Sequence, residues 1–144
     1  MKSASKLTIL KGVYVLIIQL TSDVDTSIGA LGTRHFARGL YAYVGSAQTN
    51  LEKRISRHFR KEKRKFWHID YLLDNHAAKI LKVLFKEAAK TEECKIAWEI
   101  SRRNEAVVGF GCSDCNCKSH LFLINNQNFV FVDLKELITC EISS

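Results

Sequence analysis

The sequence predicts a single α+β domain. The chain has 144 residues, close to the commonest size of one domain, and 47% of them are hydrophobic, which is enough for a core. Segments rich in β-branched and aromatic residues alternate with segments of helical periodicity, so we expect both strands and helices. Proline is absent and no low-complexity segment occurs. Residues 1–144 are therefore expected to form one domain.

Three strands are expected in the first third of the chain. Residues 12–20 form an apolar, β-branched run typical of a buried strand. Residues 26–31 predict a shorter strand, and residues 33–38 predict a loop. In the third strand, residues 40–44, the alternation of apolar residues places Tyr41 and Tyr43 on one face.

A basic helix is expected after the third strand, with Thr49 or Asn50 as its N-cap. Apolar residues recur at a spacing of four along it, which predicts a buried stripe made of Leu51, Ile55 and Phe59. Basic residues recur at three to four and predict a second stripe, made of Arg54, Arg57, Lys61 and Arg64. His58 lies one helical turn from Arg54.

The rest of the chain predicts further short elements. Helices are expected at residues 67–73, 92–103 and 134–140, and a strand at residues 79–85. Residues 109–120 are rich in Gly, Cys and Ser and predict a loop. Residues 120–124 and 129–132 flank the run Asn125-Asn126-Gln127-Asn128, which predicts a hairpin.

The positive charge is concentrated in one segment. The net charge is +7, and residues 51–66 contain eight basic and two acidic residues, a net +6. Such a local charge favours a polyanionic partner such as nucleic acid. The alternative is a solvated helix face, but the position of the run directly after Tyr43-Val44-Gly45 favours a phosphate-binding surface.

Nothing in the sequence indicates a membrane or secreted protein. No apolar run reaches the roughly 18–20 residues that span a bilayer, and residues 1–11 lack the apolar core of a signal peptide. A cytoplasmic protein is expected by default. The five cysteines are an odd number, which argues against a disulfide framework.

Four residues are candidates for phosphodiester chemistry. Hydrolysis requires a deprotonated water and positive charge at the phosphate. Arg54 has the forked geometry for bidentate phosphate contact, and Tyr14, Tyr43 and His58 can orient or deprotonate water. Taken singly, each has an ordinary explanation: core tyrosines, a surface arginine and a half-buried helix histidine.

A metal ligand is expected on the third helix. Mg²⁺ usually takes one or two carboxylates and keeps several waters, so a single glutamate is sufficient. Glu93 and Glu99 are the candidates, and their separation of six residues places them on different faces of a helix. At most one of them should therefore point into a shared cleft.

The order of these residues resembles the GIY-YIG nuclease superfamily. Gly12-Val13-Tyr14 and Tyr43-Val44-Gly45 are similar to its two motifs, and the following helix carries Arg54 and His58 at the family's spacing. The resemblance implies a small antiparallel sheet of three central strands plus added strands, flanked by helices. It implies that Tyr14 and Tyr43 are the motif tyrosines, Arg54 the catalytic arginine and Glu93 the metal ligand.

Further segments resemble the Uri-type branch of that superfamily, long described as a domain of unknown function. They are residues 67–72, residues 109–121 and the pair Glu93-Cys94, and the likeness runs from residue 11 to residue 123. Val13 replaces the isoleucine of the first motif, and the gap between the motifs is longer than in the simplest members. His68 and Asp70 are weaker candidates for supporting roles.

A zinc site is a separate hypothesis. Cys112, Cys115, Cys117 and His120 are soft ligands that begin with a C-x2-C pair. Four ligands within nine residues are crowded, because zinc motifs normally combine two separated pairs. The alternative is that the cysteines are small buried apolar side chains.

The sequence therefore predicts a Mg²⁺- or Mn²⁺-dependent endonuclease acting on DNA, selective for DNA structure, with a role in DNA repair implied by the superfamily. A non-catalytic nucleic-acid-binding module of the same fold is the alternative, and the residues do not distinguish DNA from RNA. The expected contacts to the phosphate backbone are Lys53, Arg57, Lys61 and Arg64.

Overall fold

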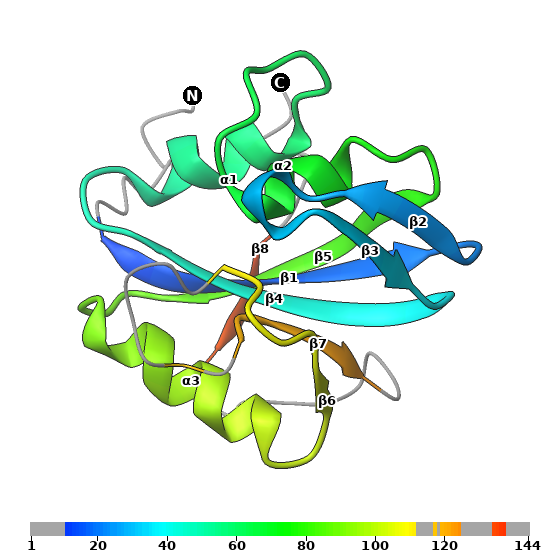
Figure 1. The fold of residues 1–144 in the computed structure, drawn as a ribbon. Helices are drawn as coiled ribbons and strands as arrows, with labels where there is room; N and C mark the ends of the chain where they lie inside the picture. The colour runs from blue at the N-terminus through cyan, green and yellow to red at the C-terminus, as the bar shows by residue number, and fades with distance from the viewer. Residues whose placement is uncertain (1–10, 112–116, 118, 125–133, 138–144) are drawn as a thin grey trace.

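The computed structural model describes residues 11–111, 117, 119–124 and 134–137, and a six-stranded antiparallel sheet forms its centre (Figure 1). The strand order is β6-β7-β4-β1-β5-β8. The three long central strands are β4 (Gly39–Ala47), β1 (Gly12–Leu20) and β5 (Ala78–Lys86). The outer strands are short: β6 (Glu105–Ala106), β7 (Leu121–Ile124) and β8 (Lys135–Leu137).

Helices cover both faces of the sheet (Figure 1). On one face lie α1 (Leu51–Phe59), α2 (His68–Leu73) and the hairpin of β2 (Val24–Ser27) and β3 (Thr33–Phe36), which encloses the short 3₁₀ helix η1 (Gly29–Leu31). On the other face lies α3 (Thr91–Ser101). The predicted α+β class, with an antiparallel sheet flanked by helices, is confirmed.

The apolar run of β1 reflects burial on both faces. Tyr14, Leu16 and Ile18 belong to the core beneath α1 and α2. Val13 and Ile17 belong to the core beneath α3. Because side chains alternate across a strand, a strand covered on both sides must be apolar throughout, and this is the pattern in the sequence.

The first helix begins as predicted but ends early. The side chain of Asn50 accepts a hydrogen bond from the backbone N–H of Lys53 at 2.9 Å, so Asn50 is the N-cap. The helix stops at Phe59, and Nζ of Lys63 donates to the carbonyl oxygens of Arg57 and His58 at 3.0 and 3.2 Å. A cation at these carbonyls in the last turn stabilises the helix end. The predicted stripe is therefore wrong for Lys61 and Arg64, which lie beyond the helix.

Three other element predictions are wrong. A strand is expected at residues 26–31, but strand β2 ends at Ser27 and Gly29–Leu31 is the 3₁₀ helix η1. A loop is expected at residues 33–38, but Thr33–Phe36 is strand β3, paired with β2. A helix is expected at residues 134–140, but Lys135–Leu137 is strand β8, paired with β5. Strands β3 and β8 are short, and pairing with another strand overrides their local pattern. Of the expected hairpin, β7 is present, and residues 129–132 lie outside the described part of the chain.

No helix in the described ranges has the length and apolarity needed to cross a bilayer.

Candidate functional site

A cleft of about 530 Å³ lies beside the last residues of β4. Strand β7 pairs with β4 only from Leu40 to Tyr43, so within the described residues the segment from Gly45 to Ala47 pairs with β1 alone. Side chains from both faces of the sheet reach the cleft around this edge. The lining residues are Tyr14, Tyr43, Gly45, Ser46, Gln48, Thr49, Arg54, Phe66, Trp67, His68, Lys90, Glu93 and Gly111.

Gly45 is required by the position of Tyr14. The two residues are paired across β1 and β4, and a Cβ at Gly45 would lie 2.5 Å from both Cζ and Oη of Tyr14. Any side chain there would displace the phenol, because real Cβ contacts are never that short. The glycine of the Tyr43-Val44-Gly45 motif thus has a packing reason that is visible in the structure.

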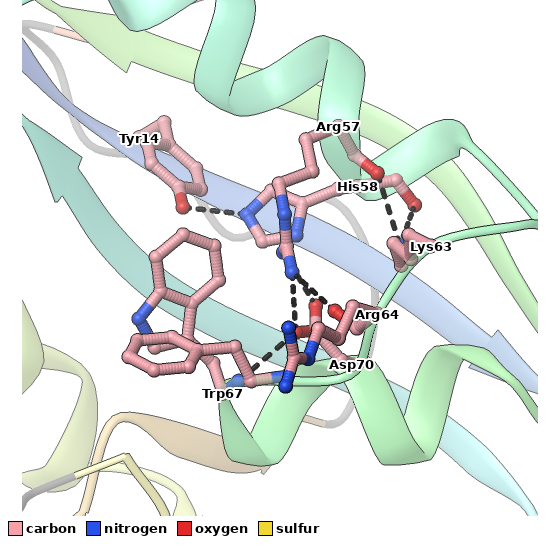
Figure 2. Close-up of polar contacts among 8 residues, drawn as sticks. Tyr14, Arg57, His58, Lys63, Arg64, Trp67 and Asp70 are labelled. Atoms are coloured by element: carbon pink, nitrogen blue, oxygen red, sulfur yellow. Dashed lines mark hydrogen bonds and ion pairs between the residues drawn. The ribbon is translucent and has the colours of Figure 1, made fainter.

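The phenol of Tyr14 contacts a buried histidine (Figure 2). Oη of Tyr14 lies 2.6 Å from Nε2 of His58, which is 3% exposed. Burial, followed by the positive charge of Lys63, lowers the pKa of His58 to about 3, so the ring is neutral at physiological pH. Its other nitrogen, Nδ1, has no hydrogen-bond partner among the described residues.

Both cleft tyrosines are held in their protonated form. Burial raises the pKa of Tyr14 well above its ordinary value, and the charge and hydrogen bond of Arg54 oppose this rise only in part. Burial also raises the pKa of Tyr43, with the neighbouring Tyr14 and Glu93 adding to the effect. In this state the phenols are hydrogen-bond donors.

Arg54 is fixed at the wall of the cleft. Its Nη1 donates to the backbone carbonyl of Ser46 at 2.7 Å, and its Cζ lies 4.4 Å from the ring centroid of Trp67. A guanidinium at this distance from an indole gains a cation–π interaction. Two contacts therefore orient Arg54, while the group still lines the cleft.

Asp70 organises the segment that carries Trp67 (Figure 2). Its carboxylate is fully buried and accepts hydrogen bonds from Nη1 and Nη2 of Arg57 at 2.8 and 2.9 Å, and from the backbone N–H groups of Phe66 and Trp67. Burial alone would raise the pKa of Asp70, but these hydrogen bonds and the charge of Arg57 lower it. Arg57, expected to contact phosphate, is thus engaged in a structural ion pair, with a side chain that is 21% exposed.

Glu93 reaches the cleft and Glu99 does not. Oε1 of Glu93 accepts a hydrogen bond from the hydroxyl of Ser46 at 2.7 Å, and Oε2 lies 2.9 Å from Nδ1 of His120. Glu99 is exposed and pairs with Arg102 at 3.6 Å, away from the cleft. Each oxygen of Glu93 retains a further lone pair, so the carboxylate could hold a divalent cation at the cleft wall.

A second groove of about 560 Å³ lies beside the cleft along α1, and both share Thr49 and Arg54. The exposed residues Lys53 and Arg60 line it. Lys61 and Arg64 are also exposed, on the segment that follows α1, but they do not line the groove. Positive charge therefore continues outward from Arg54 through this groove.

A set of soft ligands lies behind Glu93. Ligand atoms of Cys94, Cys117 and His120 all lie within 4.8 Å of one another. Cys117 and His120 belong to the set expected from the sequence, whereas Cys94, which comes from α3, was not expected. Cys112 and Cys115 lie outside the described residues.

Three further cleft residues, Ser46, Phe66 and Trp67, were not predicted from the sequence as members of the site. Ser46 follows the glycine of the second motif, so its position in the sequence was a usable signal. Phe66 is 76% exposed at the cleft, a rare position for a large apolar side chain. His68, a weaker candidate, lines the cleft and accepts a hydrogen bond from the backbone N–H of Gly111 at 2.8 Å.

The arrangement can bind an anion and a cation side by side. Arg54 supplies a fixed positive charge, the protonated Tyr43 supplies a hydroxyl donor, and Glu93 supplies a carboxylate. An oxyanion placed between Arg54 and a cation on Glu93 would be stabilised from both sides.

Comparison with known proteins identifies one family. The profile of the family described as "Domain of unknown function DUF123" matches residues 13–141. No curated protein and no solved structure matches the chain significantly.

Proposed function

The chain belongs to the DUF123 family, and from that premise we propose that it is a Mg²⁺- or Mn²⁺-dependent endonuclease that hydrolyses DNA phosphodiester bonds. We further propose that the family is a branch of the GIY-YIG nuclease superfamily. The central strands β4, β1 and β5 form an antiparallel core of the kind that this superfamily implies, and the tyrosines of both motifs line one cleft.

One observation carries the proposal. Arg54 and Glu93 come from helices on opposite faces of the sheet, yet both contact Ser46 and line the same cleft. The backbone carbonyl of Ser46 orients the guanidinium, and its hydroxyl orients the carboxylate. A phosphate-binding cation and a metal-binding anion are thus held at a fixed distance, as catalysis by positioning requires.

Each residue has a role in the proposed reaction. Arg54 holds a non-bridging oxygen of the scissile phosphate, and the phenols of Tyr14 and Tyr43 orient the attacking water. Nε2 of His58, 2.6 Å from Oη of Tyr14, is placed to take the proton of the phenol as the phenol takes one from the attacking water, so no free phenolate forms. Glu93 holds the metal, which supplies positive charge to the phosphate oxygens when bound.

The second groove supports nucleic acid as the substrate. Lys53 and Arg60 are exposed along it, at a position where a backbone entering the cleft at Arg54 would continue. Such contacts give affinity that depends on salt and little on sequence. Lys61 and Arg64 would extend this surface. We also propose that the protein acts in the cytoplasm.

Cleavage of defined DNA substrates tests the proposal. Linear, nicked, flap and branched duplexes are incubated with Mg²⁺, with Mn²⁺ and with EDTA. We expect metal-dependent cutting that Arg54→Ala and Glu93→Gln reduce by about 10²-fold or more. Glu99→Gln and Arg102→Ala are the matched controls, because both residues lie on or beside α3 outside the cleft, and both should cut like the wild type.

The rival function is a binding module without catalysis. It would give gel shifts on the same substrates and no cutting under any metal condition. Parallel assays on RNA of the same shape distinguish a ribonuclease, since none of the described cleft residues selects against a 2′-hydroxyl.

A further inference from the structure

We propose that Cys94, Cys117 and His120 bind a structural zinc ion, and that Glu93 positions His120 for this role. The proposal concerns a site behind the cleft and does not depend on nuclease activity. It shares Cys117 and His120 with the set expected from the sequence and adds Cys94 from α3, so that the ligands come from two separated segments.

The spacing of the three ligand atoms fits a zinc ion. All three lie within 4.8 Å of one another. Around a tetrahedral ion with Zn–S near 2.3 Å and Zn–N near 2.0 Å, ligand atoms are about 3.6–3.8 Å apart. A contraction of at most about 1 Å would therefore bring the three atoms to the separations of a zinc site.

The chemistry of the ligands selects the metal. Two thiolates and one imidazole form a soft donor set, which favours zinc over Mg²⁺ or Ca²⁺. Three protein ligands leave a fourth position for a water molecule. Two thiolates would neutralise the ion, which suits a site where both cysteines are half-buried and His120 is only 2% exposed.

Glu93 holds the imidazole in the orientation that such a site needs. Its Oε2 lies 2.9 Å from Nδ1 of His120, so Nε2 is the nitrogen that would face the ion. A carboxylate on the second nitrogen is the usual partner of a zinc-bound histidine, because it fixes the tautomer and the ring direction. Cys94 is the next residue along α3, so one helical turn carries both the positioning group and a ligand.

The backbone around His120 is fixed independently of any metal. Its N–H donates to the carbonyl of Phe110 at 2.9 Å, and its carbonyl accepts from the N–H of Val44 in β4 at 2.9 Å. The ligand is therefore attached to the central sheet, as Glu93 is through Ser46. A zinc ion would tie α3 to the segment preceding β7.

Metal analysis of the intact protein tests the site. The chain is purified with its thiols reduced, supplied with zinc, and freed of excess metal by gel filtration. We expect about one equivalent of bound zinc, and less than about 0.2 equivalents in Cys94→Ser and Cys117→Ser. His35→Asn, at an exposed histidine on β3, is the control and should retain zinc like the wild type.

Cobalt substitution keeps the test decisive if a cysteine variant fails to fold. In the wild type, Co²⁺ at this site should give thiolate-to-cobalt charge-transfer absorption and the visible bands of a tetrahedral ion. Glu93→Gln should keep that spectrum but weaken zinc affinity about 10–100-fold in competition with a chelator. Wild-type protein with neither zinc nor the cobalt bands, or Cys94→Ser with undiminished zinc, would overturn the assignment. Neither result bears on the nuclease proposal, which the cleavage assay tests separately.

Discussion

Oη of Tyr14 lies 2.6 Å from Nε2 of His58, so a residue on the cleft wall is joined directly to a neutral imidazole in the core. The imidazole is buried on α1 among the aromatic rings of Tyr14, Tyr43 and Trp67. This contact links the stability of the fold to the chemistry proposed for the cleft, because both would depend on the same histidine.

The stability of the protein should fall as the pH drops from 6.5 towards 4. The pKa of His58 is about 6.5 when unfolded and about 3 when folded, so between these values the unfolded state binds one more proton. The free energy of unfolding should therefore decrease by about 1.4 kcal/mol per pH unit. Urea unfolding at pH 7, 6, 5 and 4.5 measures it, and His58→Phe should flatten the curve. Identical slopes in the two proteins would rule out His58 as the cause.

Tyr14→Phe should slow cleavage and also lower stability. The variant keeps the ring that packs in the core but loses the hydroxyl that lines the cleft. Single-turnover cleavage should slow by about 10²–10³-fold. Leaving Nε2 of His58 without its partner should cost about 1–3 kcal/mol of unfolding free energy, measured in urea. Wild-type cleavage by Tyr14→Phe would exclude the hydroxyl from the reaction.

Asp70→Ala should destabilise the protein strongly. It removes the buried partner of Arg57 and the acceptor of two backbone N–H groups, so we expect a loss of about 3–5 kcal/mol in urea unfolding. Arg57→Ala should be similar, since it leaves the carboxylate buried without its cation. Asp74→Ala, at an exposed carboxylate at the end of α2, is the control and should change stability by less than about 0.5 kcal/mol. If Arg57→Ala lowers stability only slightly, Arg57 is instead a candidate for contact with DNA.

Lys53→Ala and Arg60→Ala should weaken DNA binding without changing stability. Both residues are exposed in the second groove, and removing one phosphate-binding side chain should reduce the salt dependence of log K by about one unit. Fluorescence anisotropy at several salt concentrations measures the slope. Lys79→Ala, at an exposed lysine on β5 outside both grooves, should bind like the wild type. If all three variants lose affinity equally, the groove has no special role.

Phe66→Ala should reduce affinity for branched or single-stranded DNA more than for intact duplex. The ring is 76% exposed beside the cleft and is positioned to stack on an unpaired base, which is worth about 1–3 kcal/mol per base. Trp98→Ala tests whether any exposed aromatic has this effect, because Trp98 is 61% exposed on α3 and does not line the cleft. Equal losses on all DNA shapes would argue against a role in structure selection.

The sequence was sufficient for the long elements and insufficient for short strands that form only through pairing with another strand. Strand β1 and the start of α1 follow from local patterns, since burial on both faces and an Asn50 cap leave direct signals. Strands β3 and β8 do not, because they exist through pairing with β2 and β5.

The same division applies to the cleft. Because Glu93 and Glu99 lie on different faces of a helix, the sequence limited the expected metal ligand to one of them. The structure brings Glu93 to the cleft. The role of Arg57 could not be predicted, because nothing in the basic run shows that one of its residues pairs with the buried Asp70. Cys94 was missed for a similar reason, since it approaches Cys117 only through the packing of α3.

Ser46 also sets where the chain tolerates insertions. Its carbonyl and hydroxyl face different helices, so adding or deleting one residue in β4 would turn every following side chain to the other face of the sheet. Arg54 and Glu93 would then lose their common neighbour, even if the sheet still formed. Length variation among relatives should therefore be absent from the last residues of β4.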